Sequence, residues 1–222
     1  MTTMNALQLP PVTLPQEKYT HLGTYLDEKY ETMWYYLQPE PRPCVTKQLL
    51  EDLKLFHHDL GYAMDHPDGP SIKYLVLGSG IPGVFNLGGD LELFQHLIET
   101  RNREALFEYG KACIDTMYPH HIELERDLTS ITLIQGDALG GGLEAALSSS
   151  IVIAEKGTKM GFPEIMFNLF PGMGAFSFVS RKLNAKMAEK IILSGKLYLA
   201  EELHEMGLID ILAEKGEGER AV

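Results

Sequence analysis

Cysteine, positive charge and long hydrophobic runs are all scarce in this sequence of 222 residues. The two cysteines, Cys44 and Cys113, form no CxxC pair, which indicates a reducing compartment. No apolar run approaches the ~20 residues that a membrane-spanning helix needs, so we expect no membrane association. The opening segment MTTMNALQLPPVTLPQ has neither the basic nor the apolar region of a signal peptide. Together these features predict a soluble, cytoplasmic protein.

Positive charge is scattered as well as sparse. Lys and Arg number 19 against 31 Asp and Glu, which gives a formal net charge of -12, and no basic run is longer than Arg181-Lys182. A nucleic-acid surface needs clustered basic residues. The charge pattern therefore argues against nucleic acid as a partner.

The apolar residues, 45% of the chain, are enough for one substantial core. Residues 1–17 are rich in proline and predict a flexible arm, whereas 18–222 predict a single domain. Strand patterns alternate with helix patterns, which is typical of an α/β domain. The expected elements are a hairpin over 21–38, a helix from Thr46 that ends at Gly61, buried strands over 72–78, 130–136 and 151–155, helices across 90–118 (broken near Thr100) and 174–193, and a helix–strand pair over 200–214.

The segment GSGIPG, Gly78 to Gly83, matches the GxGxxG pattern of dinucleotide-binding folds and follows a predicted strand. However, Pro82 and a second glycine pair interrupt the helix that should begin there. No strand ending in Asp or Glu follows ~20 residues later, where a ribose partner would lie. We therefore interpret this segment as a turn.

Two glycine-rich turns stand out, VFNLGGDL (Val84–Leu91) and ALGGGLEAAL (Ala138–Leu147). Each follows a buried strand and opens a helix, where the first N–H groups have no partner inside the helix. Two such turns side by side could direct two N–H donors at one oxygen and so form an oxyanion hole. Ordinary strand-to-helix turns are the alternative for each turn alone. Asp90 is expected to cap the helix that begins at Leu91.

Two glutamates accompany these turns. Glu144 follows the glycines by one helical turn, and Glu164 stands after Pro163 among apolar residues. Carboxyl groups in apolar surroundings have raised pKa values, and a pair of them suits one acid and one base acting on the same hydroxyl. For Glu164, a charge near the start of a helix is an equally good interpretation.

These motifs, together with GFPE and LFPGMGAFSF, resemble the crotonase (enoyl-CoA hydratase) superfamily over about Leu75 to Glu214. The resemblance implies an α/β fold built as a spiral of repeated β-β-α units. It also implies that the backbone N–H groups of Gly89 and Gly141 hold a thioester oxygen. The positions of the two hydratase glutamates are matched by Glu144 and Glu164. No cofactor is implied.

Within the superfamily, FNLGGDLELF and FPEIMFNLFPGMGAFSF are similar to the diffusible signal factor synthases, which make cis-2-unsaturated fatty acid signals for quorum sensing. Such enzymes dehydrate a 3-hydroxyacyl thioester on acyl carrier protein and then hydrolyse the thioester. The resemblance therefore implies a lyase with thioesterase activity. A conventional enoyl-CoA hydratase or isomerase is the alternative, and a non-catalytic binding partner of a signal sensor protein is another. A sensor partner is also compatible with catalysis.

Superfamily members normally continue into a C-terminal helical region that closes the acyl pocket and supports trimers. This sequence ends at GEGERAV, soon after its last predicted strand, so we expect that region to be absent from it. The resemblance implies a homo-oligomer, either a trimer or a dimer of trimers. Candidate residues for lining an acyl pocket, for which core packing is an equal alternative, are Met160, Phe162, Leu169, Met173 and Phe176.

Two lesser patterns carry no predicted chemistry. His120-His121 with Glu123 and Glu125 has no recognised metal-ligand spacing, so we expect solvated side chains and no metal site. Ser148 to Ser150 lie too far past the glycine turn to act as nucleophiles, and no GxSxG surrounds them.

Overall fold

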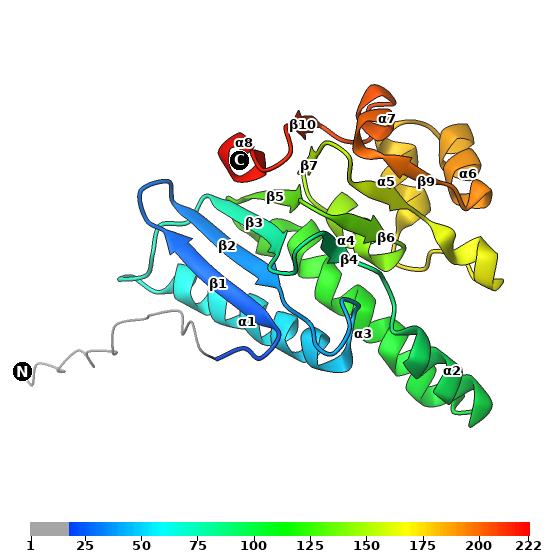
Figure 1. Ribbon diagram of the computed structural model, residues 1–222. Coiled ribbons are helices and arrows are strands. Elements are labelled where there is room, and N and C mark those ends of the chain that lie inside the picture. The colour runs from blue at the N-terminus through cyan, green and yellow to red at the C-terminus, as the bar shows by residue number, and fades with distance from the viewer. Residues whose placement is uncertain (1–17) are drawn as a thin grey trace, which may run out of the picture.

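The computed structural model describes residues 18–222, so the predicted arm at 1–17 lies outside the described residues (Figure 1). A six-stranded sheet runs in the order β1-β2-β3-β5-β7-β10, and a four-stranded sheet in the order β4-β6-β8-β9. The strands of the first sheet are β1 (Leu22–Asp27), β2 (Thr32–Leu37), β3 (Tyr74–Ser79), β5 (Thr129–Ile134), β7 (Ile151–Glu155) and β10 (Ile211–Ala213). Those of the second are β4 (Val84–Asn86), β6 (Asp137–Leu139), β8 (Lys159–Gly161) and β9 (Leu197–Leu199).

From β3 to β8, consecutive strands alternate between the two sheets. The pairs β3/β4, β5/β6 and β7/β8 each contribute one strand to each sheet, and helical segments follow each pair. Neighbouring strands are parallel except in the hairpin β1/β2 and the pair β8/β9. This arrangement confirms the predicted α/β fold of repeated β-β-α units.

Helices cover the six-stranded sheet, with α1 and α3 along the same side of it (Figure 1). The helices are α1 (Lys47–Asp65), α2 (Leu91–Glu99), α3 (Arg103–His121), α4 (Gly141–Leu147), α5 (Ala175–Lys182), α6 (Ala185–Ser194), α7 (Ala200–Glu205) and α8 (Gly218–Ala221). Two short 3-10 helices are η1 (Glu123–Glu125) and η2 (Pro163–Phe167). No helix within 18–222 is both long and apolar enough to cross a membrane.

Local signals fixed several element boundaries correctly. The Thr46 hydroxyl accepts the N–H of Leu49, and the Asp90 carboxylate accepts the N–H of Leu93. The predicted helix start at Thr46 and the predicted N-cap at Asp90 are therefore confirmed. The predicted stop at Gly61 is wrong, because α1 continues to Asp65. A Cβ atom at Gly61 would lie 3.1 Å from the Arg126 guanidinium, so this glycine allows a close contact inside the helix.

The GSGIPG segment is a turn, as predicted. It joins β3 to β4, so a strand rather than a dinucleotide-binding helix follows it. A Cβ atom at Gly136, in the connection between β5 and β6, would collide with the backbone of Gly83 and Val84. The β3–β4 and β5–β6 connections therefore pass close to each other, which brings β4 and β6 side by side.

Side chains along β2 point alternately to the two faces of the sheet, and each face has its own hydrophobic cluster. Tyr35 packs toward α1, where its ring centroid is 4.8 Å from that of the fully buried Phe56. Trp34 lies on the opposite face, in a smaller cluster with Val76 and Ile153. Successive side chains of β2 reach opposite faces of the sheet because side chains along a strand alternate with a period of two.

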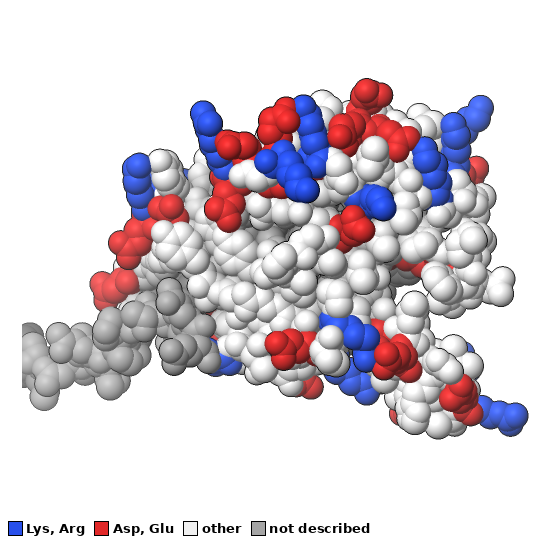
Figure 2. All heavy atoms as spheres, viewed as in Figure 1, with Lys and Arg blue, Asp and Glu red and all other residues white. Residues whose placement is uncertain are grey.

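Charged side chains are mixed on the surface. Figure 2 shows acidic and basic groups interspersed on the face presented, with no continuous basic patch there.

Candidate active site

The two glycine-rich turns meet at the carboxyl ends of β4 and β6, which pair in parallel. A Cβ atom at Gly88 would lie 3.0 Å from the Gly141 nitrogen, and one at Gly141 would lie 3.8 Å from the Gly89 nitrogen. Gly88 and Gly140 also adopt positive φ angles of 88° and 52°. Glycine is required here both for backbone conformation and for close approach.

Two backbone donors at this junction are unused. The Gly88 N–H donates to Asn86 Oδ1 (2.8 Å), and the Gly140 N–H donates to the Gly161 carbonyl (2.9 Å). By contrast, the N–H groups of Gly89 and Gly141 donate to no acceptor within the described part of the chain. Two neighbouring free N–H groups can together bind one oxygen that carries negative charge.

Glu144 lies in the first turn of α4 and is only 2% exposed. Its Oε1 atom accepts the backbone N–H groups of Met173 (2.7 Å) and Ala175 (3.0 Å), which fix the carboxyl group in place. Burial raises the pKa of Glu144 to about 7, although these N–H groups lower it, and the charge of Glu164 raises it further. The carboxyl group can therefore hold or release a proton near neutral pH.

Glu164 is the second residue of η2 and reaches the same turn from another direction. A Cβ atom at Gly140 would collide with Glu164 Oε1, so the carboxyl group lies directly against this glycine. Its Oε2 atom is buried and has no hydrogen-bond partner among residues 18–222. Burial raises the pKa of Glu164 as well. The fold thus brings a buried carboxyl group, that of Glu144, and a half-buried one, that of Glu164, to the two free N–H groups.

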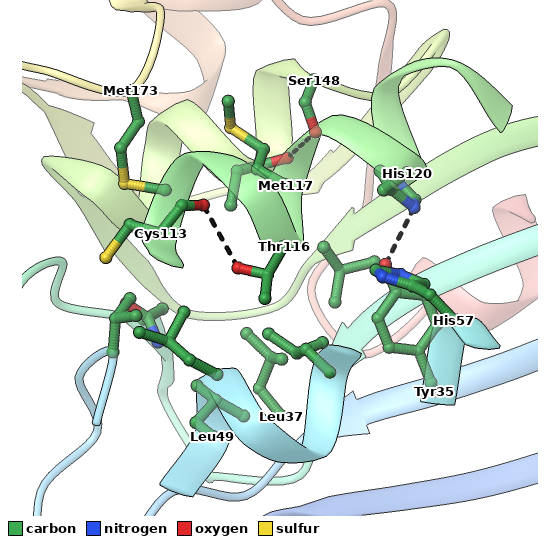
Figure 3. Close-up of a pocket in the computed structure, with 16 residues that line it drawn as sticks. Tyr35, Leu37, Leu49, His57, Cys113, Thr116, Met117, His120, Ser148 and Met173 are labelled. Atoms are coloured by element: carbon green, nitrogen blue, oxygen red, sulfur yellow. Dashed lines mark hydrogen bonds between the residues drawn. The ribbon is translucent and has the colours of Figure 1, made fainter. Parts of the chain in front are cut away.

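A cavity begins beside this site and runs between α1, α3 and β2 (Figure 3). A water-sized sphere can be centred within about 50 Å³ of it. Cys113 on its wall is close enough to Glu144 that the glutamate charge contributes, after burial, to raising the pKa of the thiol. The lining residues that the sequence did not single out include Leu37, Leu49, Leu53, His57, Leu77 and Met117.

Of the five residues predicted to line an acyl pocket, Met173 lies on this cavity. Met160 and Phe162 are fully buried in the main core, as the alternative interpretation of core packing has it. Leu169 and Phe176 are 39% and 48% exposed and do not line the cavity. Apolar character was the signal for all five, and it does not distinguish a core position from a cavity wall.

The prediction that His120 is solvated is wrong. His120 is 2% exposed, and its ring nitrogens pair with the Tyr35 hydroxyl (2.8 Å) and the Ser149 hydroxyl (2.7 Å). Its place on the inner face of α3, opposite β2, accounts for the burial. The signal that could have revealed it is its seven-residue spacing from Cys113, which puts both on one helix face.

Several known proteins are similar to this chain in sequence. The family model described as enoyl-CoA hydratase/isomerase matches residues 53–217. The enoyl-CoA isomerase/hydratase fer4 of Mycosarcoma maydis is 31% identical over 181 residues, which are 79% of this chain and 62% of that protein. A probable mitochondrial enoyl-CoA hydratase 2 of Arabidopsis thaliana is 27% identical over 83% of this chain and 58% of its own length. This chain thus spans about three fifths of the length of these two relatives.

Solved structures share the fold. DspI of Pseudomonas aeruginosa is 26% identical, with a TM-score of 0.77, over 92% of this chain and 78% of that one. An enoyl-CoA hydratase of Bacillus anthracis has a TM-score of 0.79 at 21% identity, over 91% of this chain and 73% of its own, and this likeness supports the fold alone.

Proposed function

Because this chain belongs to the enoyl-CoA hydratase/isomerase family, we propose that it removes water from a 3-hydroxyacyl thioester, with Glu144 and Glu164 as the acid–base pair. The observation that carries the proposal is the meeting of two carboxyl groups, one buried and one half-buried, with two backbone N–H groups that have no acceptor among residues 18–222. A pair of carboxyl groups alone, or a pair of unused N–H groups alone, is common in proteins. Their combination suits a reaction that moves protons next to a carbonyl group.

In this proposal the thioester oxygen accepts hydrogen bonds from the N–H groups of Gly89 and Gly141. When the C2 proton leaves, negative charge moves onto that oxygen, and two donors already in place stabilise it without reorganising. Gly88 contributes through its conformation, since a side chain there would press on the Gly141 nitrogen.

One of the two glutamates takes the C2 proton, and the other gives a proton to the 3-hydroxyl group, which leaves as water. The C2–H and C3–O bonds break and a C2=C3 double bond forms, so atoms and charge balance. The raised pKa of Glu144, about 7, lets this group be protonated in one half of the reaction and ionised in the other.

We further propose that the substrate is carried on acyl carrier protein and that the same carboxylates then activate water to hydrolyse the thioester, releasing a cis-2-unsaturated fatty acid signal. The similarity of FNLGGDLELF and FPEIMFNLFPGMGAFSF to the signal synthases supports this choice. Residues 71–100 contain a single Lys or Arg, Lys73, and its ammonium group pairs with the Glu31 carboxylate. This segment therefore offers little to the phosphates of CoA.

A conventional enoyl-CoA hydratase or isomerase is the second candidate. It is favoured by the relatives from Mycosarcoma maydis and Arabidopsis thaliana, which are named as enzymes of enoyl-CoA. The two candidates share the glutamate pair and the oxyanion hole and differ in the carrier and in the hydrolysis step.

The test is product analysis by mass spectrometry with matched medium-chain 3-hydroxyacyl thioesters of carrier protein and of CoA. We expect free 2-enoic acid from the carrier-protein substrate, and loss of it in Glu144→Gln and Glu164→Gln. Glu51→Gln, on the exposed face of α1, is the matched control and should behave like the wild type. An enoyl thioester without release, or a strong CoA preference, would favour the hydratase. No turnover of either substrate would favour a binding role.

A further inference from the structure

The cavity has one end at the proposed catalytic site. Val45 lines it and pairs with the first glycine turn, since its N–H donates to the Gly88 carbonyl (2.8 Å). Met173 also lines it, and the Met173 N–H holds the Glu144 carboxyl group. Figure 3 shows Met173 and Cys113 at one side of the cavity and Tyr35, His57 and His120 at the other.

The length of the cavity follows from the helices that form its walls. Leu49 and His57 lie eight residues apart on α1, which corresponds to roughly 12 Å along the helix axis. Cys113 and His120 mark the same two ends on α3, seven residues or roughly 10 Å apart. An extended chain advances about 1.2 Å per backbone bond, so this length takes about ten carbons.

Between the two ends the walls are apolar. Leu37 comes from β2, Leu53 from α1 and Met117 from α3. A mainly apolar passage of this length fits an unbranched alkyl chain, because each methylene group that enters leaves water and meets mostly hydrocarbon and thioether atoms. Thr116 also lines the passage, and its hydroxyl donates to the carbonyls of Ala112 and Cys113.

The far end is polar and tightly packed. A buried hydrogen-bond chain runs from Tyr35 through His120 to Ser149, with distances of 2.8 and 2.7 Å, and continues to Thr132 at 2.6 Å. His57 stands against Tyr35, with ring centroids 6.1 Å apart, and both of its ring nitrogens are buried without a partner in the described chain. Burial lowers the pKa of His57 to about 4 and that of His120 to about 3, so both rings are neutral at pH 7.

We propose that His57, together with the hydrogen-bonded pair Tyr35–His120, is the end wall of an acyl-binding cavity and limits its ligand to a medium chain of about ten carbons. A longer chain would have to displace the imidazole of His57 or break the Tyr35–His120 hydrogen bond. This hydrogen-bonded chain joins Tyr35 of β2, His120 of α3 and Thr132 of β5, so the end of the cavity is more rigid than the methionine-lined walls. The orientation of the ligand rests on the proposed function, but the length limit is a property of binding.

The experiment measures competition of saturated fatty acids of eight to sixteen carbons against a fluorescent fatty acid bound to the full chain. For the wild type, affinity should rise about fourfold with each methylene up to about ten carbons and then fall. His57→Ala should move this limit at least two carbons longer. His57→Leu keeps the volume and should leave the limit in place, and Phe107→Ala, on the exposed face of α3, is the control.

Leu53→Phe narrows the middle of the cavity and should shorten the limit, which provides a second test if His57→Ala does not fold. A wild-type profile without a length limit, no binding of any fatty acid, or an unchanged limit in folded His57→Ala and Leu53→Phe would overturn the proposal. Binding with the expected limit but no turnover of any thioester would refute the proposed function and leave this inference standing.

Discussion

The substitution Glu144→Gln should abolish a pH-dependent loss of stability. Glu144 has an ordinary pKa of 4.5 that burial raises to about 7 in the folded protein. Between these two pH values the unfolded chain has released its proton while the folded chain still holds it. Stability therefore falls as pH rises through this window and is constant above it.

The magnitude follows from the same two values. A difference from 4.5 to about 7 corresponds to about 3 kcal/mol of stability lost between pH 4.5 and 7. Glutamine cannot ionise, yet its side-chain oxygen can still accept the N–H groups of Met173 and Ala175. Relative to the wild type, the variant should therefore gain about 3 kcal/mol on going from pH 5 to pH 8.

Urea unfolding of both proteins at pH 5, 6, 7 and 8 measures this difference, since the contributions of groups that do not interact with Glu144 cancel between them. Glu51→Gln removes an exposed carboxylate from α1 and should show no comparable trend. Parallel curves for the wild type and Glu144→Gln would mean that Glu144 is ionised throughout in the folded protein. The argument from burial, and with it the use of Glu144 as a proton carrier near neutral pH, would then fail.

Three further changes test other parts of the structure. Gly140→Ala places a methyl group against the Glu164 carboxyl group at a residue with a positive φ, so turnover should fall at least tenfold. The control is Gly157→Ala, which also has a positive φ but lies in open space, and it should leave turnover unchanged. Equal losses of turnover in the two variants would show that backbone strain alone is responsible. Asp90→Ala removes the cap of α2 and should cost about 1 kcal/mol in urea unfolding, since the half-exposed pairing with Arg42 adds little; a cost near zero would contradict the capping role. Phe56→Ala should lower the free energy of unfolding, measured in urea, by about 3–5 kcal/mol, because Phe56 is fully buried against Tyr35. Leu55→Ala, at its more exposed neighbour, should lower it by less than about 1 kcal/mol. Similar values for the two variants would mean that α1 does not pack on β2 as described.

Short-range signals were enough to predict the local parts of the structure. Thr46 and Asp90 satisfy N–H groups three residues away, so their capping roles can be read from adjacent sequence. The glycine runs mark where a strand turns into a helix, and Glu144 follows Gly141 within one helical turn. For these features, the interacting groups are neighbours in the chain.

The rest depends on contacts between distant segments. Apolar periodicity places Leu49, Leu53 and Phe56 on one face of α1, but it does not say that Phe56 meets the core while Leu53 lines a cavity. Met160 and Met173 look alike in sequence, and only the pairing of β8 with β6 buries the first of them.

The candidate site itself shows the same division. The residues with the necessary chemistry can be identified from the sequence alone, because two carboxyl groups and two glycine turns are recognised one by one. That Glu164 lies against Gly140, and that His57 and His120 meet at the end of one cavity, follows from the packing of distant segments. Glu164 and Gly140 are 24 residues apart in the sequence, and His57 and His120 are 63 residues apart. Such separations are closed by the burial of the whole core, so no local pattern encodes them.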